Sequence, residues 1–376
     1  LGVEIADEEI QRILESLQMR VATDEGGWVV SPPSHRFDMQ YEVDLIEEVA
    51  RIHGYDSIPE TTLASAAPLE TVTESRIEVE RAAATLIARD YQEVVTYSFI
   101  DPESNLKFTG QESKLVLSNP ISEGLSVMRG SLWPGMVAAA ASNVARQQER
   151  VRVFEASRSY HGSLGEHTEV VRLAGLATGS VAPEQWGSKA RVLDLFDIKA
   201  DVEAILALSC NAGELEFSPT EHPALQPGQA ANIRRGDTVI GVVGKLHPTL
   251  AKDYDLKRPT FHFELDAQKA LATTAPEATA ISKFPVIRRD IAVVVDADVC
   301  VHDLVTTVAG SAPGLIRDVK VFDIYTGEGI EAGRKSVAIG LILQETSRTL
   351  TDEDADSAMA AAVAELEHKF AAYLRD

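Results

Sequence analysis

Two segments rich in alanine, threonine and proline divide this chain into three blocks and constrain its fold more than any other feature. The first, at 61–74, reads TTLASAAPLETVTE, and the second, at 272–280, reads ATTAPEATA. Neither has the apolar periodicity of a packed helix or strand, so both are predicted to be linkers. A chain of 376 residues has room for several hydrophobic cores. The sequence predicts an α+β multidomain protein with domains at 1–62, 63–271 and 282–375.

The third block has the clearest pattern. Apolar alternation predicts strands at 290–295, 316–324 and 336–343, and helical spacing predicts helices at 301–308 and 352–374. Thr351 is the expected N-cap of the last helix, with acidic residues in the first turn. The order β-α-β-β-α in under a hundred residues is typical of the ferredoxin-like split βαβ fold. A final edge strand is expected to be missing or very short.

The middle block combines many short strands with few long helices. Helices are predicted at 77–88 and 136–146. Strands are predicted at 94–99, 115–117, 151–154, 171–177, 239–243 and 260–265. This mixture indicates a domain built on a largely antiparallel sheet.

The first block is a small α+β unit. Residues 5–17 have helical spacing, residues 27–30 are extended, and Pro32 and Pro33 break the chain. A second helix is predicted from Glu42 to His53, with Gly54 as a left-handed C-cap. Two helices around an extended segment indicate a winged-helix-like domain.

Four acidic residues of the first block form the densest polar cluster. Asp44, Glu47 and Glu48 have helical i, i+3 and i+4 spacing, and Asp38 in the preceding turn could fold back toward them. Mg²⁺ prefers such carboxylate oxygens together with water. The alternative is a solvated acidic first turn in which Arg51 pairs with Glu47. The residue pattern alone favours that alternative.

A local basic patch is predicted in the third block. The net charge of −23 argues against a broad positive field, so any contact with nucleic acid must be local. Phe284, Phe322 and Tyr325 could stack on unpaired bases. The basic residues that a split βαβ fold could gather near one sheet edge are Lys283, Arg288, Arg289, Arg334, Lys335 and Arg348.

The alternative to this patch is structural. The same basic residues could form ion pairs within the block while the aromatic residues belong to the core. The acidic partners would be Asp290, Asp323 and Glu345. The sequence does not decide between the two interpretations.

Motifs in all three blocks resemble, in the right order, the β subunit family of bacterial phenylalanyl-tRNA synthetases. The first block carries PSHRFD at 33–38 and EVDLIEEVARIHGYDSIP at 42–59. The middle block carries NPIS at 119–122, MRGSL at 128–132, FEASR at 154–158, FDIK at 196–199 and GKLHP at 244–248. The third block resembles a ferredoxin-fold anticodon-binding domain through SKFP at 282–285, RRDIA at 288–292, FDIY at 322–325 and SRTLT at 347–351.

The resemblance implies a part in a cytoplasmic ligase that joins phenylalanine to tRNA-Phe with ATP, as an (αβ)₂ heterotetramer without membrane contact. This chain would be the C-terminal portion of the β subunit, supporting the catalytic α subunit and binding tRNA through its third domain. The resemblance also implies a Mg²⁺ ion shared with the α subunit. Carried over by position, its ligands here are Asp38, Asp44, Glu47 and Glu48, which reverses the preference stated above.

The middle block resembles the catalytic fold of class II synthetases but lacks a pattern that their chemistry requires. These enzymes stabilise the phosphates of ATP with arginines, one of them in a GxGxGxxR-type segment. The corresponding place, near Gly241 and Gly244, continues with Lys245, Leu246 and His247. We therefore expect a non-catalytic pseudo-synthetase domain, with no catalytic residue in this chain.

One expectation concerns the start of the chain, and two alternatives concern its function. The chain opens at Leu1 without a methionine and is expected to be N-terminally truncated, lacking the family's N-terminal tRNA-binding and editing domains. The alternative function is a non-enzymatic scaffold whose ferredoxin-like domain binds a small ligand. A free-standing Mg²⁺-dependent enzyme using the Asp38 cluster is a further alternative.

Overall fold

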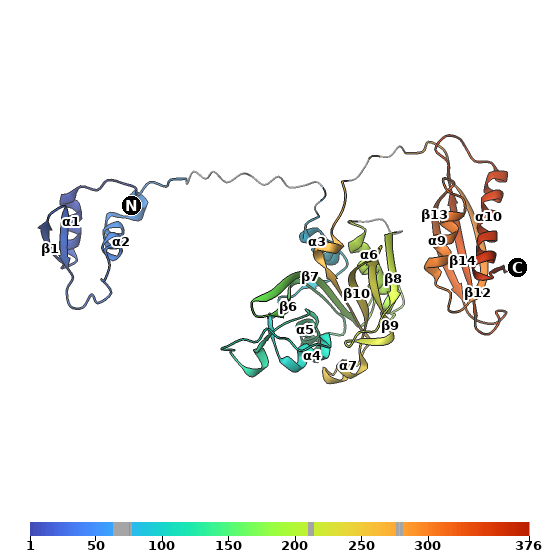
Figure 1. Cartoon of the computed structure of the whole chain (residues 1–376), viewed down its shortest axis with the longest axis horizontal. Helices are drawn as coiled ribbons and strands as arrows, with labels where there is room; N and C mark the ends of the chain where they lie inside the picture. Colours follow the sequence, from blue (N-terminus) through green and yellow to red (C-terminus); the bar gives the residue numbers. More distant parts are fainter. Residues whose placement is uncertain (63–74, 76, 210–213, 276–277, 279–280, 376) are drawn as a thin grey trace. The chain divides into compact units, whose positions relative to one another are not determined.

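The computed structural model describes residues 1–62, 75, 77–209, 214–275, 278 and 281–375 (Figure 1). The chain divides into two compact units, residues 1–71 and 72–376. Most of the two predicted linkers lies outside the described residues, so the three-domain boundaries stay predictions. None of the helices in the described ranges combines the length and apolarity needed to cross a membrane.

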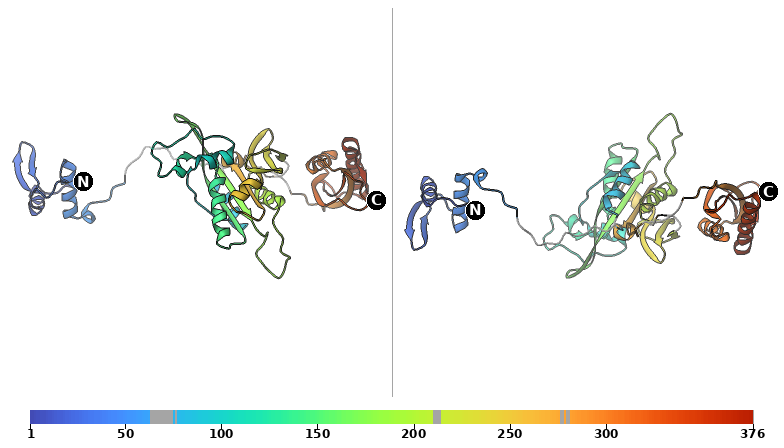
Figure 2. Two further views of the ribbon diagram at one scale, coloured as in Figure 1. Left: turned by 90° about the horizontal axis from the view of Figure 1, so that it is seen from below. Right: turned by 90° about the horizontal axis from the view of Figure 1, so that it is seen from above.

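The first unit combines α-helices with a β-hairpin, as Figures 1 and 2 show. Its elements are α1 (Asp7–Ser16), β1 (Arg20–Asp24), β2 (Gly27–Ser31), α2 (Glu42–His53) and a short 3₁₀ turn (Tyr55–Ser57). Ile13, Leu14 and Val49 form its small core. Both predicted helices are confirmed, but β1 was not predicted, because its residues are mostly exposed and polar. Gly54 is the C-cap of α2, as predicted, and has the positive φ of 99° that favours glycine, but its ψ of 121° differs from that of the left-handed helical conformation.

A seven-stranded sheet forms the middle of the chain, in the order β3-β6-β7-β11-β10-β9-β8. Every neighbouring pair is antiparallel except β3 and β6, which confirms the predicted sheet type. The strands are β3 (Gln92–Glu93), β6 (Val151–Ser163), β7 (Glu166–Thr178), β8 (Leu215–Pro219), β9 (Leu225–Arg235), β10 (Thr238–Leu246) and β11 (Thr260–Asp266).

Hydrophobic cores lie on both faces of this sheet, because successive strand residues point to opposite sides. Phe154 packs with α3 (Val79–Ala88), α6 (Leu195–Leu206) and α8 (Ala267–Ala270) on one face. The neighbouring Val153 packs with the other helices on the opposite face. Those helices are α4 (Pro102–Thr109), α5 (Trp133–Ala145) and α7 (Pro248–Asp253).

Several predicted strands of the middle block differ from the structure. β6 and β7 form a hairpin of 13 residues on each side, longer than predicted because its outer half is polar and partly exposed. The predicted strand at 94–99 is wrong: only Phe99–Ile100 is extended there as β4, paired with β5 (Val127–Met128). Within 115–117, Val116 forms an isolated bridge with Val127.

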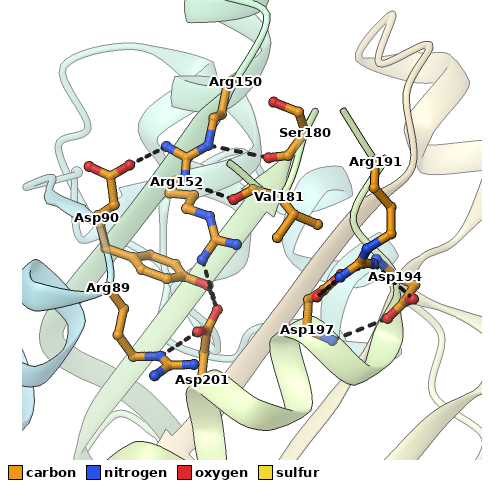
Figure 3. Close-up of polar contacts among 11 residues, drawn as sticks. Arg89, Asp90, Arg150, Arg152, Ser180, Val181, Arg191, Asp194, Asp197 and Asp201 are labelled. Atoms are coloured by element: carbon orange, nitrogen blue, oxygen red, sulfur yellow. Dashed lines mark hydrogen bonds and ion pairs between the residues drawn. The ribbon is translucent and has the colours of Figure 1, made fainter. Parts of the chain in front are cut away.

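Asp201 on α6 links three elements through a buried network (Figure 3). Its carboxylate accepts hydrogen bonds from Arg89 Nε at 2.5 Å, Tyr91 Oη at 2.7 Å and Arg152 Nη1 at 3.0 Å. Burial raises the pKa of Tyr91 well above its usual value, so the hydroxyl remains a donor. Figure 3 also shows Arg150 joined to Asp90 near this network.

The third part forms a four-stranded sheet in the order β13-β14-β12-β15. Its elements are β12 (Ile287–Asp296), α9 (Val301–Ser311), β13 (Ile316–Tyr325), β14 (Arg334–Leu343), α10 (Asp352–Phe370) and β15 (Tyr373–Leu374). This order is that of a split βαβ fold, which confirms the prediction. Thr351 caps α10 by accepting from the backbone nitrogen of Asp354. The helix ends earlier than predicted, because Ala371 is left-handed and the chain turns into the short edge strand β15.

Replacing Asp201 with alanine is expected to destabilise the middle part by about 3–5 kcal/mol, because the buried guanidinium of Arg152 and the partly exposed one of Arg89 would lose their counter-charge. Urea unfolding followed by tryptophan fluorescence measures this loss, since Trp133 is buried in the core on the other face of the same sheet. The matched control is Asp90→Ala, which removes an exposed partner of Arg150 and should cost at most about 1 kcal/mol. Equal losses in the two variants would contradict the role of the Asp201 network.

Candidate functional site

One face of the third sheet is left uncovered by helices. Side chains alternate along β12 and β14, so Val293, Ile339 and Leu341 enter the core beneath α9 and α10. The intervening residues point to the opposite face, hereafter the open face. Its centre is formed by the small residues Ser336, Ala338 and Gly340 on β14.

Three arginines lie over aromatic rings on the open face. Arg288 covers Phe322 at 5.3 Å from the ring centroid, and Arg334 covers Tyr373 at 5.4 Å. Arg375 covers Tyr325 at 4.9 Å. A planar guanidinium on an aromatic ring retains most of its hydrogen-bonding capacity for other groups.

Gly340 allows Arg288 to lie flat across the sheet. A Cβ at Gly340 would stand 3.2 Å from Arg288 Nη2 and 3.0 Å from Asp290 Oδ1. Arg288 also pairs with Asp290 at 2.8 Å, and Arg334 pairs with Asp296 at 3.3 Å. Both acidic side chains are at least half exposed, so the surrounding water weakens these ion pairs.

The structure does not bring the six predicted basic residues together. Only Arg288 and Arg334 lie on the open face. Arg289 points to the helical side and pairs with Asp352 of α10 at 2.6 Å. Arg348 pairs with Asp354 and Glu345, and Lys335 donates to two backbone carbonyls after β12. Lys283 is exposed in the segment before β12.

Sequence reasoning missed two members of the open face. Both follow α10, whereas the sequence predicts Tyr373 at the end of that helix and predicts no role for Arg375. Pairing of β15 with β12 places Tyr373 beside Val294. Arg375 is held there by its backbone nitrogen, which donates to the Ala292 carbonyl at 2.9 Å. The aromatic residues Phe322 and Tyr325 are surface residues with a stacked arginine, so the core alternative does not describe them.

The acidic residues of the first unit do not gather around one point, because they interact with different groups. Glu48 is buried and accepts from Arg51 at 2.6 Å and from Arg36 at 3.2 Å. Hydrogen bonds from Arg51 and Arg36 lower the pKa of Glu48. Arg51 therefore pairs with Glu48. The alternative interpretation of the acidic residues expected Arg51 to pair with Glu47. Glu47 is exposed.

Asp38 and Asp44 are likewise engaged. Arg36 holds Asp38 at 2.8 Å and lowers the pKa of that carboxyl group. Asp44 accepts backbone hydrogen bonds from Gln40 and Tyr41, at 2.8 and 2.7 Å. Within the described ranges, no three acidic, histidine or cysteine side chains are arranged to hold a metal ion. As placed here, the four residues do not fit a Mg²⁺ site.

Gly241 and Gly244, near which the sequence lacks a GxGxGxxR-type segment, are packed inside the middle sheet. A Cβ at Gly241 would stand 2.5 Å from a Leu265 methyl group, and one at Gly244 would stand 2.7 Å from the Gln229 carbonyl. Both lie within β10, flanked by β9 and β11. Close strand packing explains these glycines without any phosphate ligand.

A buried histidine lies beside Trp133 in the same sheet. The rings of His262 and Trp133 have centroids 4.0 Å apart, and neither nitrogen of His262 has a hydrogen-bond partner of normal geometry. Burial, aided by the neighbouring His222, lowers the pKa of His262 to about 3. His262 is therefore neutral at physiological pH and belongs to the core.

Three family models match the chain in sequence order. They are the tRNA synthetase B5 domain at residues 1–55, the phenylalanyl tRNA synthetase beta chain CLM domain at residues 58–267, and the ferredoxin-fold anticodon binding domain at residues 282–375. Together with the split βαβ fold, these matches define a chain of an aminoacyl-tRNA synthetase.

Similarity to individual proteins shows which aminoacyl-tRNA synthetase family the chain belongs to. The chain is 44% identical to the phenylalanine–tRNA ligase β subunit of Methylococcus capsulatus, 41% to that of Pseudomonas savastanoi pv. phaseolicola and 39% to that of Coxiella burnetii. Each similarity covers 100% of this chain and 47–48% of the relative, so the chain spans about half the length of these relatives. The chain belongs to the phenylalanyl-tRNA synthetase β chain family.

Protonation of His262 is expected to destabilise the fold in acid. Between pH 6.5 and about 3 the unfolded chain binds this proton and the folded chain does not. Stability therefore falls as pH decreases, by about 1.4 kcal/mol per pH unit from this group. Urea unfolding at pH 6.5 and 5 should show His262→Leu gaining about 2 kcal/mol on the parent protein over that interval. The exposed His167→Leu is the control, and an equal gain there would contradict the assignment.

The arginine partners of the acidic cluster predict weak Mg²⁺ binding by this chain alone. Calorimetric titration with MgCl₂ should show no saturable binding, because Asp38 and Glu48 are already neutralised by Arg36 and Arg51. Arg36→Ala should increase binding, whereas Arg12→Ala, an exposed arginine on α1, should not. Saturable binding by the parent chain, abolished by Asp38→Asn, would show that these carboxylates are available.

Proposed function

We propose that this chain serves a phenylalanine–tRNA ligase as a supporting and tRNA-binding part without an aminoacylation site of its own. The observation that carries the proposal is the open face of the third sheet, with three arginines stacked on aromatic rings. This face lies in the region that matches an anticodon-binding domain. Single-stranded RNA loops are commonly bound by stacking on such surfaces.

The open face suits RNA for two physical reasons. The exposed aromatic rings and the guanidinium planes offer stacking surfaces for unpaired bases. At the centre of the sheet Ser336 and Gly340 are small and buried, so the surface that a base would meet is formed by the arginine and aromatic side chains. Arg288 and Arg334 can exchange their exposed acidic partners for phosphates, because surface ion pairs are worth only about 1 kcal/mol or less.

Binding of RNA through local contacts is also compatible with the negative net charge of the chain. A net charge of −23 repels a polyanion at long range. A stacking surface with a few arginines binds through short-range contacts that this repulsion weakens but does not remove. Other parts of the assembled enzyme would provide the remaining tRNA contacts.

For the middle part, we propose support of a catalytic α subunit in an (αβ)₂ assembly. Its glycines Gly241 and Gly244 are packed between strands, and its sequence lacks the arginine of a GxGxGxxR-type segment. Val95 and Tyr97 lie between β3 and β4 and are 91% and 71% exposed. Large exposed apolar side chains of this kind are typical of protein interfaces.

Use of ATP and Mg²⁺ by the assembled enzyme in the cytoplasm is part of the same proposal. A Mg²⁺ ion on Asp38, Asp44, Glu47 and Glu48 would require Arg36 and Arg51 to release their carboxylates. The B5, CLM and anticodon-binding matches favour the synthetase function over a non-enzymatic scaffold.

Replacing Arg288 and Arg334 together with alanine should weaken tRNA-Phe binding by the assembled enzyme about tenfold or more. The dependence of binding on salt concentration should also decrease, by about one unit of slope for each lost phosphate contact. Filter binding at several salt concentrations measures both effects. Exchange of pyrophosphate into ATP, which reports adenylate formation, should not change.

Arg289→Ala is the matched control, because Arg289 neighbours Arg288 on β12 but points to the opposite side of the sheet. This variant should bind tRNA normally. Loss of binding in Arg289→Ala alone, or normal binding in the Arg288 and Arg334 variant, would refute the open face as the contact surface.

A further inference from the structure

A cavity of about 760 Å³ lies on the face of the middle sheet that also carries α4 and α5. Apolar side chains of β6 and β7 are covered there by α5, and polar side chains continue along the same strands. Residues of β7, β10 and β11 line the cavity together with α4 and the turn before α5. Its volume is in the range of small-molecule sites.

Two opposite charges face each other in this cavity. Arg172 Nε lies 3.9 Å from Glu264 Oε2, too far for a hydrogen bond, and both side chains are largely buried. Arg172 is held in place by Nε, which donates to Ser159 Oγ at 3.0 Å, and by Nη2, which lies 3.4 Å from His161 Nε2. Burial lowers the pKa of His161, so its ring is neutral and does not repel a ligand cation.

Hydrogen bonds to one of its two carboxylate oxygens fix the orientation of the Glu264 side chain. Oε1 accepts from Ser131 Oγ at 2.9 Å and from the Leu132 backbone nitrogen at 2.8 Å. Oε2 faces Arg172 across 3.9 Å. Burial raises the pKa of Glu264. A cation placed at Oε2 would make the direct contact that Arg172, at 3.9 Å, does not make.

We propose that this cavity binds a small zwitterion of the α-amino-acid type. Its carboxylate would bind to Arg172 and its ammonium group to Glu264. Both charged groups of such a ligand are attached to one carbon atom, a spacing similar to that between the Arg172 and Glu264 charges. The apolar walls contributed by Phe108, Trp133 and Val170 would receive its side chain.

The charges around the cavity disfavour other ligand classes. Four acidic residues line the cavity with three basic ones, so its lining has no excess of positive charge that would favour a phosphate-rich ligand. These residues are Glu112, Glu166, Glu264, Asp266, Lys114, Arg172 and Lys269. A simple carboxylate would leave Glu264 without a cation, and a simple amine would compete with Arg172. A zwitterion satisfies both buried charges at once and leaves the net charge unchanged. This site is independent of the tRNA contacts on the open face.

The test uses the 376-residue chain and a mixture of the twenty proteinogenic L-amino acids. Saturation-transfer NMR should detect at least one of them on the parent chain. Calorimetry then compares that amino acid with its two analogues, one lacking the ammonium group and one lacking the carboxylate. Each analogue should bind at least tenfold more weakly.

Variants assign the binding to the cavity. Glu264→Gln keeps an acceptor for Ser131 and Leu132 but removes the charge, and Arg172→Met removes the cation. Each should reduce affinity at least tenfold, whereas Arg158→Met, which removes an exposed arginine paired with Glu169 on the same hairpin, should not. If a variant fails to fold, the analogue series on the parent chain decides.

Absence of saturation transfer for every amino acid would overturn the proposal. So would unchanged affinity in folded Glu264→Gln and Arg172→Met, or equal binding of the analogue without an ammonium group. None of these results would affect the tRNA experiment, because the Arg288 and Arg334 variant retains this cavity.

Discussion

The incomplete covering of sheets by helices is the constraint on which both candidate sites depend. In the third part, the β-α-β-β-α connections place α9 and α10 against one face, so the other face of β12, β13 and β14 remains open. In the middle part, helices pack on both faces but leave polar strand residues uncovered near Arg172 and Glu264. Ligand-accessible surface arises where strand residues have no helix above them.

Charge pairing then decides which basic side chains remain available. In a chain this acidic, many arginines have carboxylate partners, and the location of the partner determines what the pair can do. Arg152 and Asp201 are buried together and stabilise the fold. Arg36 and Arg51 neutralise Glu48 and remove it from any metal site that this chain could form by itself. Arg288 has an exposed partner and lies on an open surface, which leaves it able to bind an external anion.

Much of the third part was predictable from its sequence, because strand alternation and the Thr351 cap are local signals. The predicted strands and helices at 290–343 and the capping of α10 are confirmed. Longer polar strands were missed, as in the outer half of the β6–β7 hairpin, since exposed strand residues carry little apolar signal. The motifs were sufficient to indicate the β chain family, which the family models confirm.

By itself the sequence determined the family, the secondary-structure order of the third part and the set of charged residues available for function. Only the tertiary structure decided which of those charges are accessible. Arg288 and Arg289 are neighbours in the chain, yet strand alternation sends one to the open face and the other to Asp352 of α10. Likewise, residues as distant as Arg172 and Glu264 meet only because β7 and β11 are adjacent in the sheet. Sequence spacing does not encode such contacts, because they depend on strand order and on the partners that each side chain meets after folding.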